Sequence, residues 1–533
     1  MMTPQPFGID LGTTYSAIAI ADPVRGAEVI ANFEGENTTP SVVHFEDDGS
    51  AVIGAQAKRE QISDPDNTSS LVKRHMGESF PLDYRGQTFT PESISALILK
   101  ELVANANNQR GTAIEDVVIT VPAYFGVQER QATRQAGVIA GLKVVSIIPE
   151  PVAASISVSS ERGLSGTFMV FDLGGGTFDT TVMRASQGRV DVIAIDGNRL
   201  LGGADWDRRL EQLFLERFRE SAGLGLDRDP EADEDFMVEL RASVEEAKKT
   251  LSRRPSAAIR MKFEDISQKI EVGVEEFEEA THDLVEQTLE IAKRCIETAK
   301  AKTPGLEIDH FLLVGGSCRM PMIENRLRAE GFTPEATEYD LAVAKGAAIF
   351  ALGTTNLEIG GGDYDEKTPP ANSSLLVGPG TAVAVSNVLA RGVGVKVTDV
   401  DPSGAYIDSI AFLAHANDSI PMTATLRAGT LQDNQTRIQI ELYEQLGEVE
   451  CNDTAANREL VSGPNTCISG LPPLPKGSPV DINIEIDSDG TILLTGKEPT
   501  TGKEVRATAS VSVLTEEEVE ASRVQIAAIT TQS

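Results

Sequence analysis

Two segments of the chain repeat one design, in which an aspartate stands just before a turn rich in glycine and threonine. The first, FGIDLGTTYSAIAI, starts at Phe7, and the second, VFDLGGGTFDTTVM, starts at Val170. Glycine tolerates positive φ and exposes backbone N–H groups, so such turns can bind phosphate oxygens. A pair of carboxylates suits a hydrated magnesium ion. The sequence therefore predicts two similar lobes that close on a nucleotide, with Asp10 facing Asp172.

One such turn alone would also fit an ordinary hairpin, so the argument depends on the presence of two copies. Each copy precedes a strand-like segment that ends in a further special turn: VVITVPAYF from Val117 in the first half and FLLVGGSCR from Phe311 in the second. This parallel indicates a duplicated lobe. The hydroxyls of Thr13, Thr14 and Thr177 would add donors for phosphate oxygens.

The hydrophobic pattern divides the chain into four parts. Residues 5–352 alternate strand-like and helical runs, which is typical of an α/β domain, and 275–302 has the spacing of one amphipathic helix. Residues 353–376 are rich in glycine and proline and predict a linker. Residues 377–513 alternate apolar and polar side chains, which predicts a β-sandwich. The tail, 514–533, opens on a capping-box pattern and predicts a short helix or an unstructured end.

Charge and cysteine content exclude several classes of protein. With 47 basic and 81 acidic residues the net charge is −34, so we expect neither nucleic acid nor an anionic membrane as a partner. We see no signal-peptide pattern and no apolar run of about 18 residues, and we expect a cytoplasmic protein. Cys295 has the spacing of a buried residue on an amphipathic helix. Cys451 and Cys467 could pair in an oxidising setting, but neither belongs to a CxxC or Cys/His metal-binding pattern.

Blocks spread over the first 350 residues closely resemble the ATPase region of the seventy-kilodalton heat-shock chaperones, the DnaK-type branch of the actin and sugar-kinase superfamily. They are FGIDLGTTYS, ENTTPSVV, NTSSLVKRHMG, VVITVPAYFGVQERQATRQAGVIAGL, PEPVAA, FDLGGGTFD, LLGGADWD, EEAKKTLS, LLVGGSCRMP and DLAVAKGAA. The resemblance implies an actin-like, ribonuclease H-like ATPase domain of two lobes, followed by a β-sandwich that binds peptides. It predicts a molecular chaperone that hydrolyses ATP to control its binding of unfolded or specific client polypeptides.

The resemblance also implies roles for single residues. It assigns catalytic roles to Asp10, Lys73, Glu150, Asp172 and Thr177. Asp10 and Asp172 would hold Mg²⁺ through water, Lys73 would lie near the γ-phosphate, and Glu150 would help to orient water and metal. Taken without the resemblance, Lys73 is an exposed lysine and Glu150 a loop carboxylate.

ATP or ADP and Mg²⁺ are the implied cofactors, with K⁺ as a further candidate. The implied nucleotide-binding residues are Gly12, Thr13, Thr14, Tyr15, Gly174, Gly175, Gly176, Gly202, Gly203, Glu245, Lys248, Lys249, Ser252, Gly315, Gly316, Ser317, Arg319 and Asp340. The four from Glu245 to Ser252 have the spacing of one helix face, and a solvated charged face is the alternative interpretation. Pro122 and Arg130 match residues that relay the nucleotide state towards the second domain.

The sandwich resembles the peptide-binding β domain of the same family. That match places Ile438 in the central apolar pocket for an extended peptide, Ile440 nearby, and Leu431 on an arch above. From the residues alone, Ile438 and Ile440 fit the core of a sandwich equally well.

The chain departs from the family pattern at several points. The linker is polar and rich in glycine and proline where relatives have a leucine-rich acidic stretch, and Ser146 stands where relatives carry an arginine used by J-domain partners. About 20 residues follow the last strand, where relatives continue into a helical lid, so we expect fast release of bound peptide. A J-domain co-chaperone and a nucleotide exchange factor are the implied partners. The alternative function is an ATP-sensing scaffold with one dedicated partner, and a sugar kinase ranks third.

Overall fold

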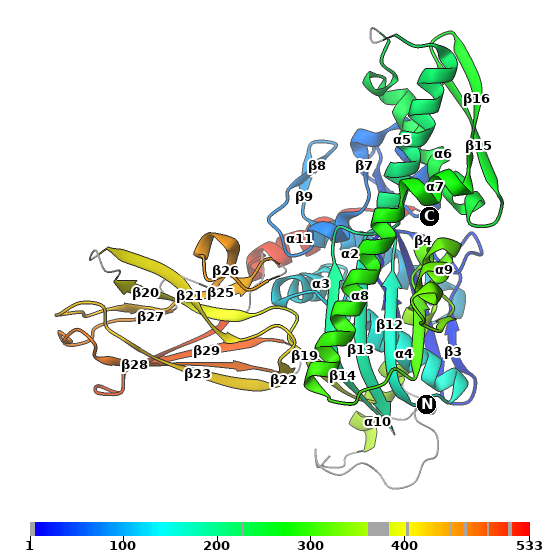
Figure 1. Cartoon of the computed structure of the whole chain (residues 1–533). Helices are drawn as coiled ribbons and strands as arrows, with labels where there is room; N and C mark the ends of the chain where they lie inside the picture. The colour runs from blue at the N-terminus through cyan, green and yellow to red at the C-terminus, as the bar shows by residue number, and fades with distance from the viewer. Residues whose placement is uncertain are drawn as a thin grey trace.

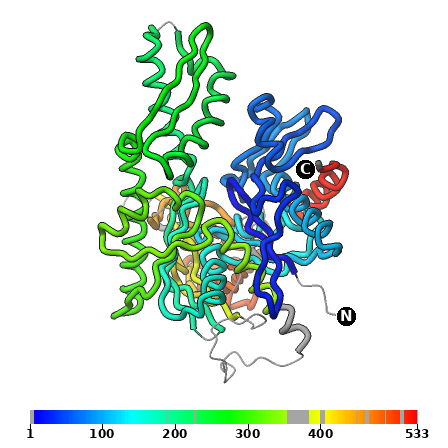
Figure 2. Tube along the Cα trace, turned by 90° about the vertical axis from the view of Figure 1, so that its right-hand side faces the viewer, coloured from blue at the N-terminus to red at the C-terminus, as the bar shows by residue number. Residues whose placement is uncertain are grey.

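An α/β domain of two lobes and a domain of antiparallel sheets lie side by side in the computed structural model (Figure 1). The structure describes residues 6–186, 188–225, 228–360, 383–400, 405–447, 449–461, 466–487, 490–509 and 514–532. Figure 2 shows the two lobes of the α/β domain next to each other, the first in blue and cyan and the second in green. Their similarity follows from the order of strands in the two central sheets.

Each lobe contains a sheet in which three parallel strands are followed by an antiparallel pair. The first lobe has the order β11 (Lys143–Pro149), β10 (Asp116–Val121), β1 (Phe7–Asp10), β2 (Tyr15–Asp22) and β3 (Gly26–Val29), with β4 (Thr39–Pro40) also paired to β2. The second has β18 (Pro334–Ala336), β17 (His310–Val314), β12 (Gly166–Leu173), β13 (Phe178–Ser186) and β14 (Arg189–Asn198). The equivalent positions of β1 and β12 confirm the predicted duplication.

Two helices, one from each repeat, pack between the sheets: α4 (Glu150–Arg162) and α10 (Ala342–Gly360). Small residues allow this packing, because a Cβ at Gly346 would overlap the carbonyl of Ala153. The helix α10 runs past residue 353, where we expected the linker to begin. The rest of that linker, residues 361–376, lies outside the described residues.

Further elements build the outer part of each lobe. In the first lobe these are α1 (Ala55–Ser63), α2 (Pro91–Arg110), α3 (Val127–Ile139), β5 (Val43–Phe45), β6 (Ala51–Ile53), β7 (Thr68–Ser69), β8 (Leu82–Tyr84) and β9 (Gln87–Phe89). In the second they are α5 (Gly203–Ala222), α6 (Glu234–Leu251), β15 (Ser256–Phe263), β16 (Ile266–Gly273), α7 (Val274–Ala280), α8 (His282–Lys302) and α9 (Pro321–Ala329). The single helix expected over 275–302 is therefore wrong. Thr281 breaks it, and its hydroxyl donates to the carbonyl of Phe277 at 2.8 Å.

The predicted β-sandwich is confirmed. One sheet has the order β21 (Tyr406–Ala414), β20 (Val393–Val400), β25 (Leu442–Gln445) and β26 (Asn457–Val461). The other has β23 (Met422–Gly429), β28 (Pro479–Ile486), β29 (Ile492–Lys497) and β30 (Glu504–Ala509), and a short pair joins β24 (Ile438–Gln439) to β27 (Cys467–Ile468). Alternate side chains of both sheets, such as Val395 and Ile484, form one buried core, as the period-two pattern requires.

The sandwich is joined to the second lobe by backbone pairing. Strand β19 (Ala384–Val388) runs parallel to β14, with Ala384–Ser386 opposite Arg189–Asp191, and β22 (Ser419–Ile420) pairs with β19. Residues 384–388 thus extend the sheet of the second lobe, although we assigned them to the sandwich. The polar sequence around Ser386 and Asn387 does not prevent this pairing, because strand addition uses backbone groups.

The C-terminal segment packs against the first lobe, beside α2 and α3 (Figure 2). Helix α11 (Glu516–Ala528) begins with the predicted capping box, in which Thr515 and Glu518 bond reciprocally. The ammonium of Lys100 donates to the carbonyls of Ile526 and Ile529 at 3.1 and 3.0 Å. Beyond the helix, β31 (Thr531–Gln532) adds a parallel strand to β6. The segment therefore becomes part of the first lobe.

We predict that Ile526→Ala destabilises the first lobe by about 2–5 kcal/mol, because Ile526 is 1% exposed within that lobe's core. Val524→Ala on the same helix is the control, since Val524 is 60% exposed and its loss should change the free energy of unfolding by less than about 0.5 kcal/mol. Urea unfolding followed by circular dichroism measures both. Equal effects of the two changes would contradict this packing.

Candidate active site

The two turns predicted to bind phosphate face each other where the lobes meet. Asp10 ends β1, and Asp172 lies at the equivalent end of β12. The turns approach closely, because a Cβ at Gly175 would overlap the side chain of Thr14, and one at Gly176 would lie 2.5 Å from Cγ2 of Thr13. Glycine is required here for this contact between lobes.

Behind the turns, one lysine lies among acidic side chains. The ammonium of Lys73, in the short helix η2 (Val72–His75), bonds to Oε1 of Glu150 at 2.6 Å. The two residues are 4% and 8% exposed, so both interpretations made without the resemblance, an exposed lysine and a loop carboxylate, are wrong. Asp10 accepts a hydrogen bond from the hydroxyl of Thr120 at 3.2 Å, and Asp179 accepts one from the backbone N–H of Ala123 at 3.1 Å.

The three aspartates of this group have raised pKa values. Burial, and after it the charge of Glu150, raises the pKa of Asp10 to about 7. The same causes, in the same order, raise the pKa of Asp172 and Asp179 well above the usual range. The group contains four carboxyls and only the cation of Lys73, so it favours an added cation.

The donor set fits a hydrated magnesium ion. Within the described ranges, no group of three or more His, Cys, Asp or Glu side chains is arranged to hold a metal directly. Mg²⁺ usually keeps several waters and uses one or two carboxylates, together with phosphate oxygens. Asp10 and Asp172 are therefore suited to hold it through water.

The second turn is fixed by its carbonyl groups. The carbonyl of Gly174 accepts from the Ser317 hydroxyl at 2.9 Å and from the Gly203 N–H at 3.0 Å. The carbonyl of Gly176 accepts from Nε and Nη2 of Arg74 at 3.1 and 2.8 Å. Arg74 belongs to the first lobe and was missed in the sequence, although it follows Lys73 directly. It ties the first lobe to the second turn.

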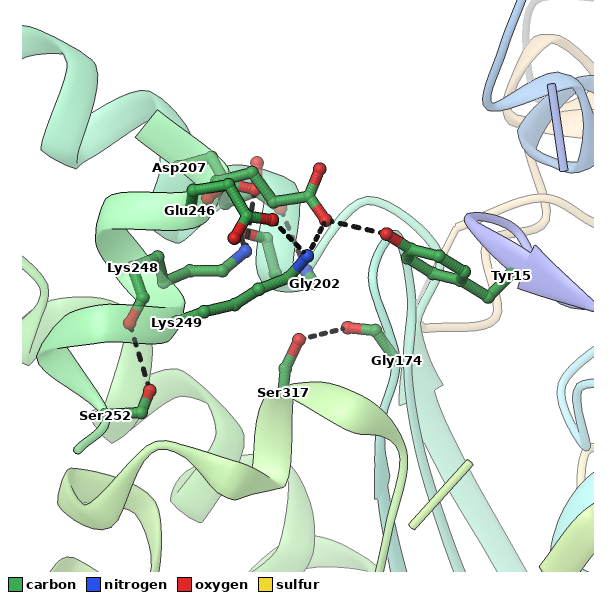
Figure 3. A network of polar contacts seen from close by, with 12 residues as sticks. Tyr15, Gly174, Gly202, Asp207, Glu246, Lys248, Lys249, Ser252 and Ser317 are labelled. Carbon is green, nitrogen blue, oxygen red and sulfur yellow. Dashed lines mark hydrogen bonds and ion pairs between the residues drawn. The ribbon is translucent and has the colours of Figure 1, made fainter. Parts of the chain in front are cut away.

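The helix α6 places its charged residues around the same turn (Figure 3). Lys248 donates to Asp207 at 2.7 Å and to the carbonyl of Gly203 at 3.1 Å, whereas Lys249 bonds to Glu246 at 2.7 Å. The Ser252 hydroxyl donates to the carbonyl of Lys248 at 3.1 Å. The predicted shared face is therefore divided, because Lys248 turns towards α5 and Lys249 towards Tyr15.

A polar cluster connects the lobes across the site. The hydroxyl of Tyr15 donates to Glu245 at 3.1 Å, and the ammonium of Lys58 donates to Tyr15 at 2.8 Å and to Glu245 at 2.6 Å. Burial acts to raise the pKa of Glu245, but Lys58 and Lys249 outweigh it and hold this pKa at about 2. Lys58 was missed because it belongs to no motif. The Lys58 side chain thus connects the first lobe to helix α6 of the second lobe.

The last predicted nucleotide-binding residues follow β17. Gly315 has a φ of 84°, in the left-handed region, and opens the short helix η4 (Gly316–Arg319). Arg319 forms an ion pair with Asp340, and its guanidinium lies 4.8 Å from the centre of the Tyr339 ring. A planar guanidinium held in this way can stack on an aromatic ligand.

The two residues predicted to relay the nucleotide state, Pro122 and Arg130, lie beside the acidic group. Arg130 donates to the carbonyl of Phe125 at 3.0 Å, and the N–H of Phe125 donates to the carbonyl of Pro122 at 3.2 Å. Arg130 also lines a small cavity together with Pro149 and, from β19, Asn387. The strand that joins the domains therefore reaches the segment that holds Asp179.

The predicted peptide-binding residues lie apart, in the sandwich. Ile438 in β24 and Ile440 are buried in the sandwich core, and Leu431 is half-buried, with its N–H donating to Gln435 at 2.9 Å. Both interpretations of Ile438 fit this placement.

All four cysteines are free, and burial raises the pKa of the Cys295 and Cys318 thiols. No helix within the described part of the chain is long and apolar enough to cross a membrane.

Comparison with known proteins covers both domains. The family described as "Hsp70 protein" matches residues 6–355 and 376–532. The chaperone protein DnaK of Thermosipho melanesiensis is 35% identical over 512 residues, which cover 93% of this chain and 78% of that protein. Those of Thermotoga petrophila and Thermotoga maritima are 34% identical over 513 residues, covering 93% of this chain and 79% of each relative. The interruption in the family match falls within the segment for which a linker was predicted.

The raised carboxyl pKa values predict how stability depends on pH without metal. Between about pH 4 and pH 7 the folded protein holds a proton on Asp10 that the unfolded chain releases, so the free energy of unfolding should fall as pH rises through this range, by at most about 1.4 kcal/mol per pH unit for one proton. Asp10→Asn should remove this contribution and stabilise the metal-free protein at pH 8 relative to the wild type.

Urea unfolding in EDTA from pH 5 to pH 8 measures the difference between the variant and the wild type. The control is Asp48→Asn, because Asp48 is exposed and its hydrogen bonds with Ser50 lower its pKa. The difference in free energy of unfolding between this variant and the wild type should therefore stay constant from pH 5 to pH 8. A difference for Asp10→Asn that is equally constant would contradict the raised pKa.

Proposed function

The chain belongs to the Hsp70 family, and on that premise we propose that it binds and hydrolyses ATP to control the binding of client polypeptides to its β-sandwich. The observation that supports this most strongly is the buried pair of Lys73 and Glu150 among three further carboxyls, set behind two phosphate turns. Phosphoryl transfer depends mostly on positioning and on the neutralisation of charge, and this arrangement is suited to both.

Each part of the site has a role in the proposed hydrolysis. Magnesium, held through water by Asp10 and Asp172, would neutralise charge on the phosphates, and K⁺ is a further candidate for the acidic group. The turns would bind the phosphates through backbone N–H groups and the hydroxyls of Thr13, Thr14 and Thr177. Lys73 would stabilise charge on the transferred group, and Glu150 would orient the attacking water. The cluster of Tyr15, Lys58 and Glu245 would hold the lobes together around the nucleotide.

Client control would use the connection between the domains. ATP would favour one arrangement of the lobes and so favour or oppose the pairing of β19 with β14. A J-domain co-chaperone and a nucleotide exchange factor are the proposed partners, and the cytoplasm is the proposed location. The alternative is an ATP-sensing scaffold with one dedicated partner, which is suggested by a linker sequence rich in glycine and proline in place of the leucine-rich acidic stretch of relatives.

We predict that Asp172→Asn lowers kcat for magnesium-dependent ATP hydrolysis by about 100-fold or more, the scale typical of losing one electrostatic group. Lys73→Ala should lower kcat more than it weakens nucleotide binding. Single-turnover hydrolysis and calorimetric titration with ATP separate the two effects. Lys143→Ala is the control, because Lys143 lies at the exposed start of β11. Wild-type rates in both site variants would refute the proposed hydrolysis.

A fluorescent unfolded peptide tests the proposed client binding. We expect saturable binding and a dissociation rate that changes when ATP replaces ADP. Ile438→Val removes one methylene from the proposed pocket and should weaken binding about fourfold, whereas Ile484→Val, which makes the same change in the sandwich core, should not. Absence of saturable binding, together with recovery of a single folded partner from a pull-down, would favour the scaffold instead.

A further inference from the structure

Helix α3 begins without a capping side chain of its own. The first backbone N–H groups of a helix have no partner within it, and a Ser, Thr, Asp or Asn side chain at the N-cap usually accepts from one of them. Here the N-cap is Gly126, whose extended backbone, with φ −73° and ψ −171°, suits a cap, but the residue has no side-chain oxygen. The partner of the first amide therefore comes from elsewhere.

That partner belongs to the other domain. The N–H of Val127 donates to Oε1 of Glu444, in β25 of the sandwich, at 3.2 Å. The Glu444 side chain is 1% exposed, and its carboxylate lies at the N-terminal end of α3, where a helix favours negative charge. We propose that Glu444 is a positioning residue that caps α3 from the sandwich and so makes the order of this helix start depend on domain docking.

Buried ion pairs hold Glu444 in this position. Arg391 bonds to Glu444 at 3.4 Å and to Glu129 of α3 at 3.0 Å. Arg458 of β26 bonds to Glu129 at 3.2 Å and to Gln128 at 2.9 Å. Two glutamates and two arginines from the two domains thus balance their charges at the interface. Separation of the domains would remove the cap and both ion pairs of Glu129 together.

The capped end is close to the acidic group of the active site. Arg130, in the first turn of α3, donates to the carbonyls of Phe125 and Ala123 at 3.0 and 3.5 Å. The N–H of Ala123 in turn donates to Asp179 at 3.1 Å. A disordered helix start would therefore loosen the segment that carries this last hydrogen bond.

Gly126 is the reason why the cap must come from the sandwich. A Cβ at this position would overlap Oε1 of Glu444. The Glu444 carboxylate cannot move away without losing its hydrogen bond from the N–H of Val127 or its ion pair with Arg391. A local cap and the cap from Glu444 therefore exclude one another. This exclusion distinguishes capping from a general packing role of Glu444.

Amide hydrogen exchange of the full chain tests the proposal without requiring ATP hydrolysis or peptide binding, so its failure would leave the proposed function unaffected. Glu444→Ala should speed exchange of the amides in 122–130 about fivefold, as expected for a lost cap. Glu444→Gln keeps an acceptor oxygen and should change it by less than twofold. Glu441→Ala, which removes an acidic side chain of the sandwich that pairs with Lys396, is the control.

Gly126→Ser supplies a local cap and gives the decisive comparison. Combined with Glu444→Ala, it should return exchange in 122–130 to within about twofold of the wild type. Introduced alone, it should displace Glu444 and speed exchange in β19, the strand that joins the domains. Unchanged exchange in Glu444→Ala, or no recovery in the double variant while α5 exchanges as in the wild type, would overturn the proposal.

Discussion

The burial of like charges where the lobes meet is the constraint on which the rest of the structure depends. Asp10, Glu150, Asp172 and Asp179 gather around the single ammonium of Lys73, and burial raises the pKa of three of them. Such a group is costly to remove from water unless cations and fixed dipoles compensate it. The duplicated sheets bring the ends of β1 and β12 together, so each lobe contributes carboxyls to the group. The group is complete only when the two lobes meet.

Contacts between distant segments keep the lobes in this arrangement. Arg74 reaches from the first lobe to the turn of the second, and Lys58 reaches α6. The chain then returns twice to the α/β domain, through β19 at the edge of the second sheet and through α11 and β31 on the first lobe. The sandwich lies between these two attachments in the chain, so it is connected to both lobes by contacts outside the acidic group.

What could be predicted from the sequence was mostly local. A strand, an aspartate and a glycine turn are adjacent in the chain, so the equivalent positions of Asp10 and Asp172 at two strand ends could be predicted from pattern alone, and so could the cap at Thr515. Burial of Lys73 and Glu150 could not be seen, because the partners are 77 residues apart. The period-two pattern predicted the sandwich, but it could not show that 384–388 pairs with the other domain, since strand addition uses backbone groups common to all residues.

The interface between the domains follows a different rule from that of the active site. Around Glu129 and Glu444 the charges balance, because Arg391 and Arg458 provide one cation for each carboxylate. A balanced buried cluster adds little net stability over an apolar contact, but removal of one member is costly. It therefore specifies how the domains dock more than how tightly they do so. The candidate active site has more carboxyls than cations and so favours an added cation, whereas the interface needs no added ligand and holds the docked arrangement with groups from the chain alone.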